Sequence, residues 1–157
     1  MRAALGYKPN TISTLWLAFQ YHSILNPSTD KFFDEKRVDQ QLDLRFSKAV
    51  GFRTRLEERF RDNAPGTSIR FRQRLIYSFI NFNTLKITPF ISDEVFLNFD
   101  QTKWTNGKAF DQNRLTVGFN KKITKDYSFT MGYLYLYSES RTTNAMIHAV
   151  NFSVSFS

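Results

Sequence analysis

The chain has 157 residues, no cysteine, 17% aromatic residues and a formal net charge of +8. Its length indicates a single domain covering residues 1–157, and the absence of cysteine excludes a disulfide framework and any thiolate metal site. No run approaches the roughly 18 consecutive apolar residues that a membrane-spanning helix needs.

Apolar and polar residues alternate with a period of two through nearly the whole chain. Between Arg37 and Phe46, for example, charged or amide side chains interleave with mainly apolar ones. Because successive side chains of a strand point to opposite faces, such a segment has one apolar face and one charged face. No segment combines helical periodicity with a cap and a stop. The pattern predicts nine strands, at residues 2–8, 13–22, 37–46, 52–61, 68–80, 86–99, 114–123, 127–138 and 145–156.

The connections between these strands alternate in length, beginning with a tight turn at 8–11 and a long segment at 24–36. Short periplasmic turns and longer outer loops are typical of bacterial outer-membrane barrels, whose two faces meet different solvents. We therefore predict an all-β fold, an antiparallel up-and-down transmembrane β-barrel of about 8–10 strands. The expected location is the outer membrane of a bacterial cell, with membrane lipid around the barrel.

The strand count of nine is odd, whereas single-chain bacterial barrels normally have an even number. No signal peptide is visible, because strand-like sequence follows Met1 at once. We expect a leader and a first strand to be missing from this chain, giving about ten strands in the parent protein, or closure by another segment or subunit. The alternative is an eight-strand barrel from Ser13 to Phe156.

Several short stretches carry a resemblance to a known family. They are Leu15-Trp16-Leu17 with Tyr21, Asp34-Glu35-Lys36-Arg37 with Gln40-Gln41, the run from Arg53 to Phe60, the run from Arg70 to Arg74, Asp93-Glu94-Val95-Phe96, and Asn113-Arg114-Leu115 with Gly118 and Phe119. In this order they resemble the proteobacterial domain-of-unknown-function family 2490, a family of outer-membrane β-barrels, over nearly the whole chain. The resemblance implies a fold, a location and further N-terminal barrel sequence, and it implies no established activity.

The predicted outer face carries large apolar residues on nearly every strand. Tyrosines near the strand ends suit the aromatic girdles at the lipid headgroups; they are Tyr7, Tyr21, Tyr77, Tyr127 and Tyr137. The alternative is a soluble β-barrel that binds an apolar or anionic ligand and holds these side chains in its core. We favour the membrane, because the narrow inner side of a barrel could not hold so many large residues.

The predicted inner face is strongly basic and has fewer acids. Its interior charge network is predicted to contain Asp39, Asp43, Arg53, Arg55, Glu57, Arg59, Arg61, Arg70, Arg72, Arg74, Glu94 and Arg114. A hairpin at 48–51 would place Asp43 beside Arg55 and Asp39 beside Arg59. A hairpin at 81–85 would place Glu94 near Arg72 and Arg74.

This network supports two interpretations. A salt-bridged plug suits a narrow barrel, which has no open lumen. The other interpretation is an anion-selective pore or a site for an anionic solute, because guanidinium groups bind phosphate or carboxylate in bidentate fashion. We favour the plug, and the role expected is structural, a narrow pore or partner-binding.

Three polar residues, Glu58, Gln73 and Asp93, interrupt the apolar outer face as a lipid-face polar patch. In the expected registers they are neighbours on consecutive strands, where charge in lipid is costly. One interpretation is a β-bulge near Pro89 that turns Asp93 inward. The other is a contact with a protein partner or a second copy of the chain.

The sequence offers little chemistry for catalysis. His22, Ser23 and Glu35 resemble the His/Ser/Glu set of outer-membrane lipid A deacylases, so a lipid-modifying hydrolase is the alternative function. Adjacent strand residues point to opposite faces, however, so we predict no catalytic residue and no enzyme. No metal-ligand spacing or phosphate-binding loop occurs, and we predict no metal and no cofactor. The arginines alternate with large apolar groups on long strands, which argues against a nucleic-acid partner.

Overall fold

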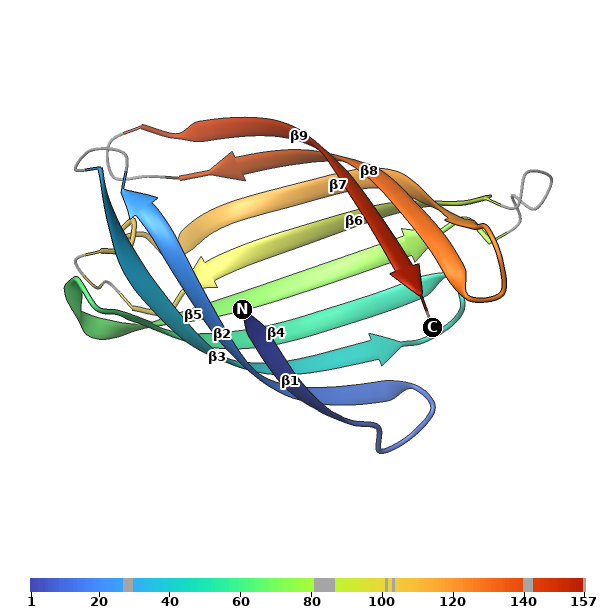
Figure 1. The fold of residues 1–157 in the computed structure, drawn as a ribbon, viewed down its shortest axis with the longest axis horizontal. Coiled ribbons are helices and arrows are strands. Elements are labelled where there is room, and N and C mark those ends of the chain that lie inside the picture. Colours follow the sequence, from blue (N-terminus) through green and yellow to red (C-terminus); the bar gives the residue numbers. More distant parts are fainter. Residues whose placement is uncertain (27–29, 81–86, 101, 103, 140–142, 157) are drawn as a thin grey trace.

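The computed structural model describes residues 1–157 apart from 27–29, 81–86, 101, 103, 140–142 and 157. Each strand pairs antiparallel with the next along the chain, in the order β1 to β9 (Figure 1). The described residues contain no helix, so the predicted all-β, up-and-down topology is confirmed. The strands are β1 (Arg2–Tyr7), β2 (Ser13–Asn26), β3 (Lys31–Arg45), β4 (Val50–Arg61), β5 (Ala64–Ser78), β6 (Ile87–Asn98), β7 (Phe110–Lys122), β8 (Tyr127–Ser138) and β9 (Ala145–Phe156).

Strands β2 and β3 are longer than the sequence pattern predicted. The segment 24–36 was expected to be a long connection, but β2 continues to Asn26 and β3 begins at Lys31. Leu25 and Phe32 pair directly across the two strands, and both are exposed on the same face. The period-two pattern therefore continues closer to the turn than the Asn26-Pro27 signal indicated.

Three turns at one end of the sheet are held by a side chain that accepts hydrogen bonds from the turn backbone. In the β1–β2 turn, Asn10 Oδ1 accepts from the amides two and three residues later, at 2.9 and 2.7 Å. Ser47 between β3 and β4 and Thr124 between β7 and β8 make the same contacts at 3.1–3.2 Å. Such turns fix the local backbone path and hence the register of each hairpin.

The sheet curls into a half-barrel whose edge strands, β1 and β9, make no contact with each other (Figure 1). Since nine antiparallel strands alternate in direction, β1 and β9 run the same way. The alternative of an eight-strand ring from Ser13 to Phe156 is wrong, because β2 pairs with β1 and β3, and β9 pairs only with β8 among the described strands. The described strands thus form the wall of a barrel without closing it.

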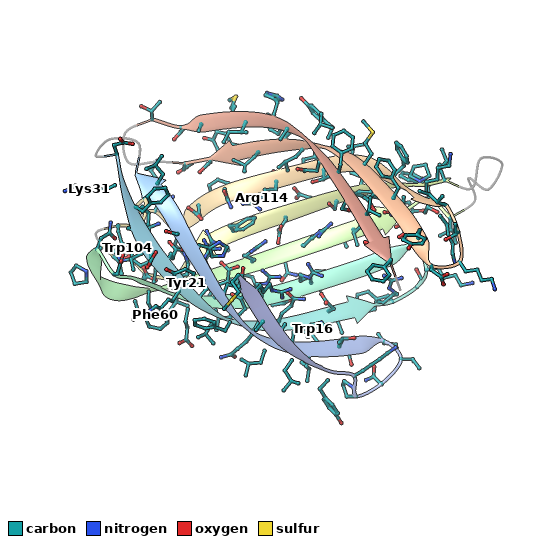
Figure 2. All side chains as sticks on the ribbon, viewed as in Figure 1. Trp16, Tyr21, Lys31, Phe60, Trp104 and Arg114 are labelled. Atoms are coloured by element: carbon teal, nitrogen blue, oxygen red, sulfur yellow. The ribbon has the colours of Figure 1, made fainter. Side chains whose placement is uncertain are left out.

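The two faces of the curled sheet have opposite character (Figure 2). The convex face exposes large apolar side chains such as Val117 and Phe152, at 51% and 64% of their surface. The concave face holds the buried side chains, most of which are polar or charged, and Glu35, Asp39 and Glu57 have no exposed surface at all.

Candidate functional site

The concave face of β3 to β7 carries a network of ion pairs, and it is the candidate site. The strand registers place every residue of the predicted interior charge network on this face. The network is centred on two carboxylates, Glu35 and Glu57, that each contact three guanidinium groups. Four further carboxylates each contact one; they are Asp39, Asp43, Glu94 and Asp111. Charge-assisted contacts of this kind, some of them bidentate, are strong hydrogen bonds and also hold the side chains in a defined geometry.

Glu35 is the centre of the cluster near the β2–β3 connection. Arg59 donates from Nε to Oε1 and from Nη2 to Oε2, both at 3.0 Å. The Nε atoms of Arg37 and Arg61 donate to the same carboxylate at 2.6 and 2.7 Å. The guanidinium groups of Arg59 and Arg61 also lie 5.1 and 4.3 Å from the ring centroid of Trp104, which Figure 2 shows towards this end of the sheet. Glu35 therefore ties β3 to β4 beneath an indole ring.

Glu57 is the centre of a second cluster, in the middle of the sheet. Its Oε2 accepts hydrogen bonds from Arg70 at 2.6 and 2.8 Å. Its Oε1 accepts from Arg72 at 2.6 Å and from Arg55 at 3.5 Å. The guanidinium groups of Arg70 and Arg72 lie 5.2 and 4.3 Å from the ring centroid of Phe96, which is fully buried. This cluster joins β4, β5 and β6.

Asp39 and Gln41 extend the network on β3. Asp39 Oδ2 accepts a hydrogen bond from the side-chain amide of Gln20 on β2 and lies 3.8 Å from Arg55 Nη1. Gln41 Oε1 accepts from Arg55 Nε at 2.8 Å. Asp39 Oδ1 is buried and has no hydrogen-bond partner among the described residues. Arg55 is thus shared by two carboxylates and an amide.

The register of β3 against β4 differs by two residues from the prediction. The structure pairs Asp43 with Arg53, whose Nε donates to Asp43 Oδ1 at 2.6 Å. The expected neighbours, Asp43 with Arg55 and Asp39 with Arg59, are wrong. The turn is centred one residue earlier than expected, so the register moves by two and every side chain stays on its predicted face.

Glu94 was expected near Arg72 or Arg74, and the structure places it between Arg74 and Arg114 in the registers of β5, β6 and β7. Its Oε1, however, accepts from Arg72 at 2.8 and 3.1 Å. Arg74 Nη2 donates to the hydroxyl of Ser92 at 3.5 Å. Within the described part of the chain, neither Arg74 nor Arg114 has a carboxylate within 4 Å.

The polar patch predicted on the outer face is formed only in part. Gln73 Oε1 accepts from the hydroxyl of Thr54 at 3.2 Å, and Asp93 Oδ1 accepts from the amide of Asn113 at 2.7 Å. Glu58 lies on the same convex face four residues along β4 from Thr54, about 13 Å away at the usual strand rise. The predicted three-residue cluster is therefore wrong, because the β4–β5 register separates Glu58 from Gln73.

The bulge interpretation of Asp93 is also wrong. Asp93 pairs with Leu75 and Leu115, which are exposed on the convex face, so it is not turned inward. The irregularity of β6 against β7 lies between Phe96 and Leu97 and leaves Pro89 in regular register.

The residues that resembled a hydrolase set do not come together. His22 pairs with Glu35 across β2 and β3, but that carboxylate binds three arginines, and His22 Nε2 instead contacts Gln20 Oε1 at 3.2 Å. Ser23 pairs with Asp34 and so points to the opposite face. A Ser–His pair needs hydrogen-bond contact, which this arrangement does not provide.

The described residues contain no group of three or more His, Cys, Asp or Glu side chains suited to a metal ion. Within the same ranges, no helix has the length and apolar character to cross a membrane.

Seven members of the network were not among the predicted site residues: Gln20, Glu35, Arg37, Gln41, Phe96, Trp104 and Asp111. Glu35 and Arg37 continue the period-two series that contains Asp39, so extending that series towards the turn would have found them. Asp111, which lies 3.1 Å from Arg70, precedes the predicted strand. The contacts of Phe96 and Trp104 with arginine depend on side-chain placement across strands, and the sequence pattern carries no signal for them.

Fold and site together define a class of protein: an antiparallel sheet curled into a half-barrel, apolar on its convex face and charged on its concave face. The chain matches the family described as protein of unknown function (DUF2490) over residues 1–146, and it belongs to that family. No curated protein and no solved structure matches it.

Proposed function

We propose that this protein is a membrane-spanning β-barrel of the bacterial outer membrane, with a structural role and a salt-bridged plug for an interior. The observation that carries the proposal is the exposure of the convex face, where every strand presents large apolar side chains. Such surface is unfavourable in water by about 25 cal/mol per Å² and favourable against lipid tails. The charged face points to the inside of the curl, as in outer-membrane barrels.

The strand lengths support this proposal. Strands β2 to β9 have 12–15 residues, which corresponds to roughly 40–50 Å at the usual rise. With a tilt of about 45° they would cover roughly 28–35 Å along the membrane normal, close to the hydrocarbon thickness. Aromatic pairs lie near both ends, Tyr127 against Phe156 and Phe110 against Tyr137, with ring centroids 6.1 Å apart in each case. These positions suit the two headgroup levels.

The packing of the interior favours a plug over an open channel. Glu35 and Glu57 each hold three arginines on the concave face, and Phe96 is buried beneath three guanidinium groups. Barrels of about eight strands have interiors just wide enough to be filled by side chains. We expect no hydrolase activity from the His22 region, because three arginines hold the Glu35 carboxylate there and Ser23 lies on the opposite face.

Folding in detergent and lipid tests the membrane location. The protein should remain folded in detergent micelles, insert into phospholipid vesicles, and migrate differently on electrophoresis before and after heating. Vesicle-inserted protein should resist a protease that digests the unfolded chain. A monodisperse, folded protein in buffer without detergent, which does not associate with vesicles, would overturn the proposal.

Partner binding is the second candidate role, and the hydrogen-bonded polar pairs on the convex face favour it. Thr54 with Gln73, and Asp93 with Asn113, place polar groups where lipid contact is costly. A second copy of the chain could cover them. Because the chain has no cysteine, Gln73→Cys would form a disulfide-linked dimer in vesicles under mild oxidation if this face is self-associated. Val117→Cys, at an apolar position on the same face, is the matched control, and equal cross-linking of both variants would contradict the role.

A further inference from the structure

Two arginines on the concave face are left without an acid partner by the network. The other arginines that β4 and β5 place on this face each lie within 4 Å of a carboxylate. Arg74 and Arg114 flank Glu94 in register, but the hydrogen bonds to that carboxylate come from Arg72. Arg114 Nε is buried and has no hydrogen-bond partner among the described residues. Both side chains are half-buried, and guanidinium groups that have no paired carboxylate attract an anion.

Both guanidinium groups line one cavity of about 250 Å³, formed where β5 to β9 curve around the concave face. Figure 2 shows Arg114 over this face. The other polar lining groups include the hydroxyls of Ser92 and Thr130 and the side-chain amide of Asn151. The cavity is large enough for a small anion and offers it both charged and neutral donors.

A glycine keeps this cavity open. Gly132 lies on the cavity wall, directly opposite Gly118 in the β7–β8 register. A Cβ atom on Gly132 would come within 3.2 Å of the methyl group of Thr116 and 3.8 Å of the Phe90 ring. A larger side chain at this position would therefore occupy space that now lies in front of the two arginines.

We propose that Arg74 and Arg114 form a binding site for a phosphate-type oxyanion on the concave face. A tetrahedral oxyanion has enough oxygen atoms to bind both guanidinium groups, the hydroxyl of Ser92 and the side-chain amide of Asn151, whereas the Thr130 hydroxyl already donates to Asn120 Oδ1 at 2.6 Å. A carboxylate has only two oxygens and would leave part of this donor set unused. The site does not depend on the proposed membrane location, because the same strands form the cavity in either solvent.

A substitution of Glu94 tests the proposal in the opposite direction, because it should strengthen anion binding. Its carboxylate lines the same cavity and repels an anion, while it also offsets the charge of the two arginines in the empty site. Replacing it with glutamine keeps the shape and removes the negative charge. Phosphate affinity should then rise several-fold, whereas the loss of either arginine should lower it by tenfold or more.

Calorimetric titration of the folded protein in phosphate-free detergent buffer tests the site. Inorganic phosphate is the probe, and acetate at the same ionic strength tests the carboxylate class. The variants are Arg74→Gln, Arg114→Gln and Glu94→Gln, with Lys121→Gln as a control that removes one exposed charge from the opposite, convex face of the sheet. Circular dichroism and heat-dependent mobility identify any variant that fails to fold.

The wild type should bind phosphate more tightly than acetate. Arg74→Gln and Arg114→Gln should weaken phosphate binding by tenfold or more, Glu94→Gln should strengthen it, and Lys121→Gln should leave it unchanged. If an arginine variant does not fold, the Glu94→Gln result still decides, because unchanged or weaker binding overturns the proposal. No phosphate binding at millimolar concentration, or equal binding of acetate, also overturns it.

Discussion

Replacing Glu57 with glutamine should be among the most destabilising single-atom changes in this protein. Its carboxylate has no exposed surface and accepts hydrogen bonds at 2.6–3.5 Å from Arg70, Arg72 and Arg55. Glutamine keeps one oxygen acceptor but turns an NH₂ group towards a guanidinium. Breaking a buried ion pair from one side costs about 3–5 kcal/mol, because the remaining charges stay buried without compensation.

Urea unfolding of the barrel in vesicles or detergent measures this cost. With a slope of about 2 kcal/mol per molar urea, the midpoint should fall by about 2 M. Glu58→Gln is the matched control, since Glu58 is the next residue of β4, lies on the convex face, and has no ion pair among the described residues. Glu58→Gln should change the free energy of unfolding by no more than about 0.5 kcal/mol, or should increase it.

A double-mutant cycle with Arg70→Met measures the interaction energy between Glu57 and Arg70 separately from their contacts with other residues. Glu57→Gln removes the carboxylate that Arg70 contacts, and Arg70→Met removes one of the three guanidinium groups that contact Glu57. The two losses overlap, so the double variant should lose at least about 1 kcal/mol less than the sum of the two. A loss below about 1 kcal/mol for Glu57→Gln would refute the reasoning. That result would indicate that water replaces the carboxylate and that the interior is wet.

Three further predictions concern the walls and edges of the sheet. Gly118→Ala should lower the urea unfolding midpoint clearly more than Gly132→Ala, because a Cβ at Gly118 would come within 2.3 Å of the Met131 carbonyl oxygen. Equal effects of the two substitutions would contradict this packing. Val117→Arg should destabilise vesicle-inserted protein by about 2–4 kcal/mol, and a neutral result in urea unfolding would contradict lipid contact on the convex face. In membrane-inserted protein the backbone amides at the outer edges of β1 and β9 should be protected from hydrogen exchange, because unpaired backbone amides are costly in hydrocarbon. Rapid exchange at both edges would argue against closure of the sheet by a further strand or subunit.

The fold could be predicted from the sequence because the pattern that indicates it is local. Period-two alternation depends only on neighbouring residues, so all nine strands and both faces could be predicted. Register is less secure, because it depends on where each turn is centred. In the β3–β4 hairpin, moving the centre by one residue exchanged the expected Asp43–Arg55 pair for Asp43–Arg53 and left both faces intact.

The residues that form the site could be predicted from the sequence, but most of the contacts between them could not. The sequence placed the arginines and acids on the concave face, and the structure has them there. Which acid binds which arginine depends on side chains long enough to reach past their direct partner, as Arg72 does when it binds Glu94 while Arg74 stands opposite. Trp104 lies in the connection between β6 and β7, where no periodic pattern exists to place it over Arg61.

The distribution of side-chain size around the concave face indicates how a closed barrel would fill its interior. Long arginines come from β4 and β5, whereas β1 presents the small residues Ala4 and Gly6 to this face. Trp16 on β2 lies on the same face and donates from Nε1 to Asp43 Oδ2 at 3.0 Å. Its ring fits because it packs against Gly6, where a Cβ atom would come within 2.5 Å of it. A narrow barrel cannot hold large side chains from every side, so the small residues of β1 leave room for the large ones that face the charge network.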